Sequence, residues 1–84
     1  MERSIIWTHE ATSQFLALTS AVQDRIEEKL VELANNPAAL ANQIKPLKGS
    51  KALRLRVGDY RIIFSEEGVI LMILRIGHRS DVYR

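Results

Sequence analysis

The feature that most constrains the fold of this 84-residue chain is a pair of β-like segments joined by Gly58 and Asp59. Before this dipeptide, leucine and valine alternate with arginine, a period of two residues that is typical of a β-strand. A two-residue connection that begins with glycine is typical of a tight hairpin turn. Pairing Val57 with Tyr60 across the turn fixes the register. One face of the hairpin is then predicted to enter the core, through Leu53, Leu55, Val57, Tyr60, Ile62 and Phe64.

The opposite face of the hairpin carries Arg54, Arg56 and Arg61, with Arg56 directly opposite Arg61. Opposed like charges destabilise a sheet by under about 1 kcal/mol per pair, so stability alone does not favour arginine here. A bound polyanion would remove the repulsion, and a guanidinium group can bind phosphate through two parallel hydrogen bonds. The face is therefore either a phosphate-binding surface or an exposed sheet face that arginine keeps soluble.

The segments around the hairpin predict one strand, two helices and a further strand. Residues 3–8 are rich in β-prone side chains, whereas residues 9–18 and 20–36 have apolar side chains at helical spacing. Residues 69–76 are almost all apolar, as in a strand that is covered on both faces. We therefore expect one α+β domain over 1–84, with the order β-α-α-β-β-β and two N-terminal helices packed on a small antiparallel sheet.

Local signals predict where these elements begin and end. Thr8 is expected to cap the first helix, and Ser20 with Gln23 three residues later has the pattern of a capping box for the second. Residues 45–51 form a basic segment with proline and glycine, which predicts an exposed, mobile loop. The tail from residue 78 is expected to continue the sheet in extended form.

The net charge of +2 hides an uneven distribution. Residues 1–41 hold three basic and six acidic side chains, a balance of −3, and residues 42–84 hold nine basic and four acidic ones, a balance of +5. Such asymmetry suggests that one half builds a surface for a polyanion. A solvated basic face is the alternative interpretation.

Composition excludes several other classes of protein. The chain has no cysteine, two histidines and no acidic cluster at ligand spacing, so we expect neither a metal site nor a cofactor. The longest apolar run, 69–74, is far short of the ~20 residues of a membrane-spanning helix. No signal peptide is visible, and a cytoplasmic protein without a membrane partner is expected.

Metal-free cleavage of RNA is one reaction that such a basic surface could support. The neighbouring 2′-hydroxyl attacks the phosphate, cations stabilise the added charge, and an acid protonates the leaving 5′-oxygen. His78 or Lys51 could transfer protons, and Tyr83 could stack on an unpaired base or pack in the core instead.

Three segments resemble the RelE branch of the RelE/ParE toxin superfamily: Lys45-Pro-Leu-Lys-Gly-Ser50, residues 53–64, and residues 76–84. The resemblance implies a microbial-ribonuclease-type fold and the toxin of a type II toxin–antitoxin pair. It implies an mRNA interferase, which inhibits translation by cutting mRNA in the ribosomal A site through metal-free attack of the 2′-hydroxyl. The implied partners are the ribosome, mRNA and a RelB-like antitoxin with an acidic C-terminal segment, through which alone the toxin would meet operator DNA.

The resemblance also implies roles for individual residues. Arg61 matches the phosphate-stabilising arginine, Arg79 the proposed general acid, and Tyr83 the tyrosine that orients or stacks on the base. Arg54 stands where the family has a lysine proposed as general base, and arginine stays protonated at neutral pH, so His78 is expected to share the proton transfer. RNA or phosphate binding is expected of Lys45, Lys48, Lys51 and Arg56.

Two other functions are compatible with the same fold. A ParE-like toxin would inhibit DNA gyrase and cut no RNA, and an RNA-binding module could retain the fold with a degraded site. The presence of Arg61, Arg79 and Tyr83 together favours the RelE interpretation.

Overall fold

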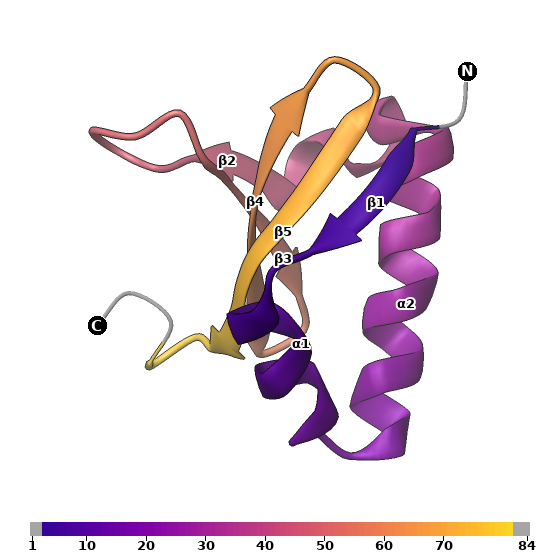
Figure 1. The fold of residues 1–84 in the computed structure, drawn as a ribbon, viewed down its shortest axis with the longest axis vertical. Helices are drawn as coiled ribbons and strands as arrows, with labels where there is room; N and C mark the ends of the chain where they lie inside the picture. The colour runs from indigo at the N-terminus through magenta and orange to yellow at the C-terminus, as the bar shows by residue number, and fades with distance from the viewer. Residues whose placement is uncertain (1–2, 82–84) are drawn as a thin grey trace.

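The computed structural model describes residues 3–81 and shows helices on one side of a five-stranded sheet (Figure 1). The strand order is β1-β5-β4-β3-β2. The α+β class predicted from the sequence is confirmed. The elements in chain order are β1 (Ser4–Trp7), α1 (His9–Leu16), α2 (Ser20–Asn35), the 3₁₀ helix η1 (Pro37–Gln43), β2 (Ile44–Pro46), β3 (Leu53–Val57), β4 (Tyr60–Glu67) and β5 (Ile70–His78).

The sheet is mixed rather than wholly antiparallel. Strands β2, β3, β4 and β5 form an antiparallel meander, but β1 lies parallel to β5, with Ser4 opposite Ile70. Strand β2 was not expected, because three residues ending in proline are too short to show a strand period, and proline is tolerated at a sheet edge.

The hairpin of β3 and β4 has the predicted register, from Val57 opposite Tyr60 to Leu53 opposite Phe64. Gly58 has a φ of 60°, a left-handed conformation that suits glycine at the first turn position. Tyr60 differs from the prediction, since it is only half-buried and its ring contacts His78 edge-on, with ring centroids 5.6 Å apart. It lies at the end of the sheet, beyond the core.

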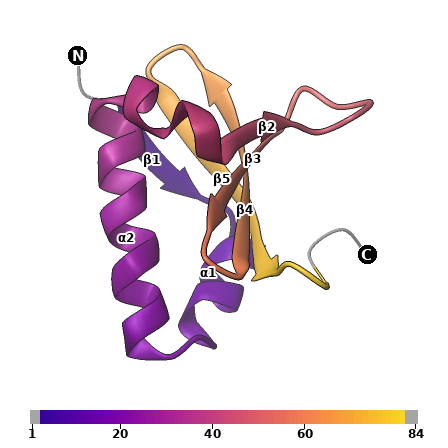
Figure 2. The same cartoon turned by 180° about the vertical axis from the view of Figure 1, so that it is seen from behind.

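The core lies between the sheet and the helices, with α2 running along one side of the sheet (Figure 2). Alternate strand residues reach this core, and α2 presents Ile26, Leu30 and Leu33 to it at spacings of three and four residues. The fully buried large side chains are Ile26, Leu30, Leu33, Leu40, Leu55, Ile62, Phe64, Leu71 and Ile73. No helix of the described part, residues 3–81, is long and apolar enough to cross a membrane.

Both helices begin at the predicted residues, His9 and Ser20, but the cap of the second helix lies one residue earlier than predicted. Thr8 Oγ1 accepts a hydrogen bond from the Ala11 amide at 3.1 Å, as predicted. The cap of α2 is Thr19, whose Oγ1 accepts from the Val22 amide at 3.4 Å, so Ser20 is the first helical residue and the predicted capping box is wrong. Gln23 instead donates from its side chain to the Phe15 carbonyl.

Helix α1 covers a stretch of β5 that has no strand beside it. The pairing of β1 with β5 ends at Trp7 and Ile73, which leaves later β5 backbone groups open on that side. Thr8 Oγ1 donates to the Leu74 carbonyl at 2.9 Å, and Gln14 Oε1 accepts from the Ile76 amide at 2.6 Å. These bonds satisfy the open edge and fix the C-terminal end of β5.

Candidate nucleic-acid interface

A concave surface lies between the middle of α2 and the turn that joins β3 and β4. Its volume is about 550 Å³. Three arginines of the predicted site, Arg56, Arg61 and Arg79, line it together. We call this surface the basic cleft; its remaining lining residues are Arg25, Glu28, Lys29, Gln43, Val57, Gly58 and Asp59.

The cleft exists because β2 is short. Its three residues pair only with Leu53, Arg54 and Leu55, because the 3₁₀ helix η1 extends to Gln43, directly before β2 begins. Arg56 and Val57 therefore lie at an open strand edge that faces α2. An unpaired edge beside basic side chains offers both hydrogen bonds and positive charge to an anion.

Arg61 is held in place by the backbone of the hairpin turn. Its Nη1 donates to the carbonyl of Gly58 at 2.9 Å and to that of Tyr60 at 3.0 Å. A guanidinium has five N–H donors, so those on its other nitrogens stay available to a phosphate. The turn thus orients Arg61 before any ligand binds.

Arg79 follows the end of β5 and is tied to the same turn by its backbone, since its amide donates to the Asp59 carbonyl at 2.7 Å. Its side chain is 65% exposed, and its Nε lies 4.0 Å from Asp59 Oδ1. An exposed ion pair of this length stabilises a protein by less than about 1 kcal/mol. The Arg79 guanidinium can therefore leave Asp59 for a phosphate at little cost.

His78 lies next to the cleft, opposite Tyr60 in the sheet. Its Nδ1 is 2.9 Å from Ser80 Oγ and accepts a hydrogen bond from the Ser80 amide at 3.3 Å. Because a backbone N–H can only donate, the proton of the neutral ring in this arrangement lies on Nε2. In the protonated ring, Nδ1–H can instead donate to Ser80 Oγ, which leaves the Nε2 proton available to a leaving group. Residues 79–81 form a turn here instead of the expected extended continuation of the sheet.

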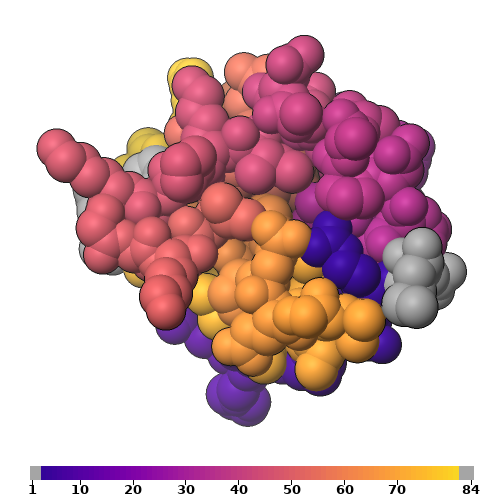
Figure 3. Space-filling model, turned by 90° about the horizontal axis from the view of Figure 1, so that it is seen from above, coloured from indigo at the N-terminus to yellow at the C-terminus, as the bar shows by residue number. Residues whose placement is uncertain are grey.

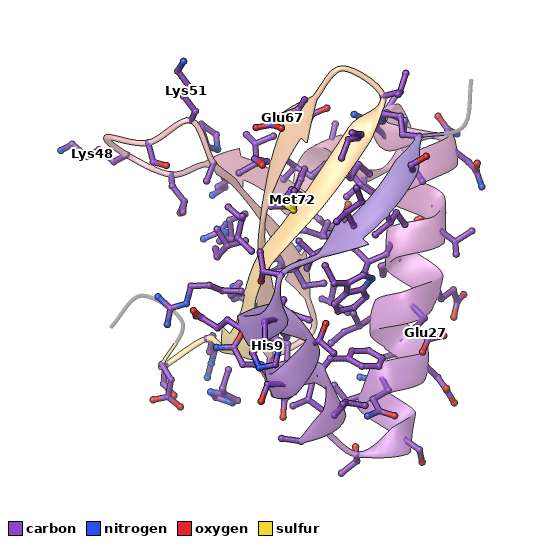
Figure 4. The ribbon with its side chains drawn as sticks, viewed as in Figure 1. His9, Glu27, Lys48, Lys51, Glu67 and Met72 are labelled. Carbon is purple, nitrogen blue, oxygen red and sulfur yellow. The ribbon has the colours of Figure 1, made fainter. Side chains whose placement is uncertain are left out.

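The remaining predicted site residues lie outside the basic cleft. Arg54 is half-buried beside Lys45 on the sheet face opposite the core. Lys48 and Lys51 are exposed on the loop between β2 and β3, which stands out from the body of the molecule (Figures 3 and 4). Tyr83 falls beyond the described residues. The structure thus joins Arg56, Arg61 and Arg79, with His78 adjacent, and separates them from the lysine loop.

Two basic residues of the cleft were not predicted as site residues. Arg25 and Lys29 belong to residues 1–41, whose net charge of −3 does not indicate an anion-binding surface. The available signal was their spacing of four residues, which places both on one face of α2. Sequence spacing alone did not show that this face looks toward the hairpin turn.

A second concave surface, of about 460 Å³, is apolar and lies between β1, α1 and α2. Its walls include Ile5, Trp7, Phe15 and Val31, and the Trp7 and Phe15 rings meet edge-on with centroids 5.0 Å apart. Val31 is 56% exposed. Among residues 3–81 no group of three or more His, Asp or Glu side chains is placed to hold a metal ion.

Comparison with known proteins identifies the class of this fold and site. A family model described as the ParE toxin of type II toxin–antitoxin systems, parDE, matches residues 5–83. The chain belongs to this toxin family.

Curated relatives specify the branch. The mRNA interferase toxin RelE of Escherichia coli (strain K12) is 29% identical over 77 residues, which cover 87% of this chain and 81% of that protein. The mRNA interferase RelE of Shigella flexneri matches with the same values. The predicted placement in the RelE branch of the RelE/ParE superfamily is confirmed, and the chain is a RelE-type toxin.

Solved structures show the same fold. A chain of the archaeal RelE–RelB complex from Pyrococcus horikoshii OT3 matches with a TM-score of 0.80 at 23% identity, over 98% of this chain and 100% of that chain. A chain of the E. coli DinJ–YafQ toxin–antitoxin complex matches with 0.79 at 17% identity, over the whole of both chains. A mutant of E. coli RelE in the free state matches with 0.74 at 26% identity, over 99% and 92%.

Proposed function

We propose that this toxin is a ribosome-dependent endoribonuclease that cleaves mRNA in the ribosomal A site without a metal ion. The observation that carries the proposal is the meeting of Arg56, Arg61 and Arg79 in one open cleft beside His78. The curated relatives are themselves named mRNA interferases, which supports the same substrate class.

In this mechanism the 2′-hydroxyl of the substrate passes its proton to a water molecule and attacks the adjacent phosphorus, and the bond to the 5′-oxygen breaks to leave a 2′,3′-cyclic phosphate. Arg61, already oriented by the hairpin turn, and the mobile side chain of Arg79 stabilise the charge that develops on the phosphate oxygens. His78 in its imidazolium form donates the Nε2 proton to the departing oxygen and ends as the neutral ring, whose Nδ1–H is directed to Ser80 Oγ, 2.9 Å away. Tyr83 is proposed to orient the base by stacking.

We further propose a RelB-like antitoxin as the partner that controls the toxin. Several similar structures are toxin–antitoxin complexes, including RelB–RelE from Methanococcus jannaschii. An acidic segment of the partner complements the basic cleft, and an amphipathic helix suits the apolar surface around Trp7 and Phe15.

Primer extension on translating ribosomes tests the enzymatic proposal. The wild-type protein should produce new mRNA 5′ ends at A-site codons, and Arg79→Ala should abolish them. Arg79 is exposed, so its loss should leave the circular dichroism spectrum and melting temperature unchanged. A supercoiling assay with DNA gyrase runs in parallel. Intact mRNA together with inhibited gyrase would replace the proposal with the ParE-like function.

A further inference from the structure

We propose that Arg25 and Lys29 of α2 bind a backbone phosphate of the RNA substrate, one that neighbours the phosphate held by Arg61. The inference rests on the proposed function for the identity of the substrate. It adds a second wall to the site, contributed by the helix instead of by the sheet. The ligand class is a single-stranded RNA phosphodiester.

The first argument is the direction of the Arg25 side chain. Its guanidinium extends from the helix to the hairpin turn, where Nη1 lies 3.7 Å from the position that a Cβ on Gly58 would occupy. Arg61 donates to the carbonyl of that same Gly58. Two guanidinium groups from distant parts of the chain thus approach one turn, on the rim of one cleft.

The second argument is that no anionic group within residues 3–81 pairs with Arg25. It makes no hydrogen bond or ion pair with any residue from 3 to 81, although Glu28 is one helical turn away. Exposed helix arginines commonly form such pairs at a spacing of three or four residues. The charge of Arg25 is directed into the cleft and is free to meet an external anion.

The third argument is the charge balance of the cleft. Its lining has five cationic side chains, namely Arg25, Lys29, Arg56, Arg61 and Arg79, against the carboxylates of Glu28 and Asp59. Three positive charges stay uncompensated. Lys29 contacts Glu32 at 3.6 Å, but both side chains are at least 40% exposed, so this contact yields easily to a phosphate. One phosphate at Arg61 would leave an excess of two positive charges, and a second phosphate would reduce it to one.

The test measures binding of an oligonucleotide that cannot react. A fluorescent single-stranded 2′-O-methyl RNA lacks the attacking hydroxyl, and its affinity is measured by anisotropy at several NaCl concentrations. Arg25→Gln should weaken binding about tenfold at low salt, as expected for one lost charge-assisted contact. It should also reduce the slope of log affinity against log salt by about 0.7, the value for one phosphate contact on a single strand.

A matched pair of variants separates the cleft from the overall charge. Glu28→Gln removes a carboxylate that lines the cleft, whereas Glu27→Gln makes the same change one residue away, on the part of α2 that borders the apolar surface (Figure 4). Glu28→Gln should tighten binding by about threefold. Glu27→Gln should leave it unchanged. Equal effects of the two variants would show that only net charge matters and would overturn the proposal.

The binding measurement tests the phosphate contact of Arg25 whether or not the protein cleaves mRNA. A lowered salt slope for Arg25→Gln supports the second phosphate position even if the wild-type protein cuts no message. An unchanged slope overturns the proposal even if cleavage is efficient. An Arg25→Gln variant that binds RNA normally but loses affinity for an acidic peptide would also overturn it, because the cleft wall would then serve a protein partner.

Discussion

At the scale of single residues, the basic side chains of the site differ in what holds them. Arg61 is fixed by two carbonyls of the turn, Arg79 is exposed and weakly paired, and Arg54 is half-buried on the sheet face opposite the core. A pre-oriented cation stabilises a transition state without further ordering, whereas a mobile one must first be ordered. We therefore expect Arg61 to contribute the most to charge stabilisation.

Substitution of Arg61 should consequently be more harmful than substitution of Arg54. Arg61→Ala is expected to lower the rate of mRNA cleavage by at least about a hundredfold, as for the loss of one oriented donor. Arg54→Ala should cost about tenfold less, since Arg54 lies outside the basic cleft and acts at longer range. Single-turnover cleavage on ribosome complexes measures both rates. The reverse order would indicate that Arg54 transfers the proton.

The arrangement around His78 predicts the result of two substitutions. His78→Ala removes the donor at Nε2 and should lower the cleavage rate by about a hundredfold, within the range for general acid catalysis. Ser80→Ala removes only the hydroxyl and keeps the amide donor to Nδ1, so a loss of under about fivefold is expected. A substrate with a better leaving group at the 5′-oxygen should rescue His78→Ala. Failure of that rescue would contradict the role as acid.

At the scale of elements, sequence reasoning succeeded where the determinants are local. The β3–β4 register follows from alternation and a two-residue turn, both of which are contained within 12 residues, 53–64. The cap at Thr19 and the strand β2 were missed, because two adjacent hydroxyl residues offer alternative caps and a three-residue edge strand has no measurable period. The parallel pairing of β1 with β5 depends on a crossover through most of the chain, which local patterns do not report.

The contact between α1 and β5 should be needed for the stability of the whole sheet. Gln14→Leu keeps the size of the side chain but leaves the Ile76 amide without its acceptor, which costs about 1–3 kcal/mol. For a domain of this size the melting temperature should fall by about 4–8 °C per kcal/mol. Thermal denaturation followed by circular dichroism measures the change. Ser13→Leu, an exposed position on the same helix, is the control and should shift the melting temperature by no more than a few degrees.

At the scale of the whole molecule, the basic half of the chain could be predicted but the complete site could not. The charge balance of +5 over 42–84 pointed to the half of the chain that contains Arg56, Arg61 and Arg79, and these three arginines line one cleft. Arg25 and Lys29 come from the acidic half and join them only because α2 packs beside the hairpin turn. Comparing the net charges of the two halves of the chain therefore points to most of the basic residues of the cleft. It misses Arg25 and Lys29, which tertiary packing brings to the cleft from the other half.

Binding of the antitoxin should stabilise the toxin, since a ligand that binds only the folded chain adds about 2.7 kcal/mol at a concentration of 100 Kd. The melting temperature of the toxin should therefore rise with antitoxin concentration and fall back partly at high salt. An antitoxin whose C-terminal carboxylates are replaced by amides is the control. An unchanged melting temperature at saturating antitoxin would contradict the proposed partnership.

The parallel pairing of β1 with β5 has a consequence for synthesis of the toxin. Within the described sheet β1 is an edge strand whose one neighbour is β5, the last strand to be made. A nascent chain can form α1, α2 and the hairpin early, but β1 stays without its partner until residues 70–78 have left the ribosome. Arg79 is oriented by the end of that same strand. The ribosome that makes this protein must therefore release residues 70–79 before the site that would act on ribosomes is assembled.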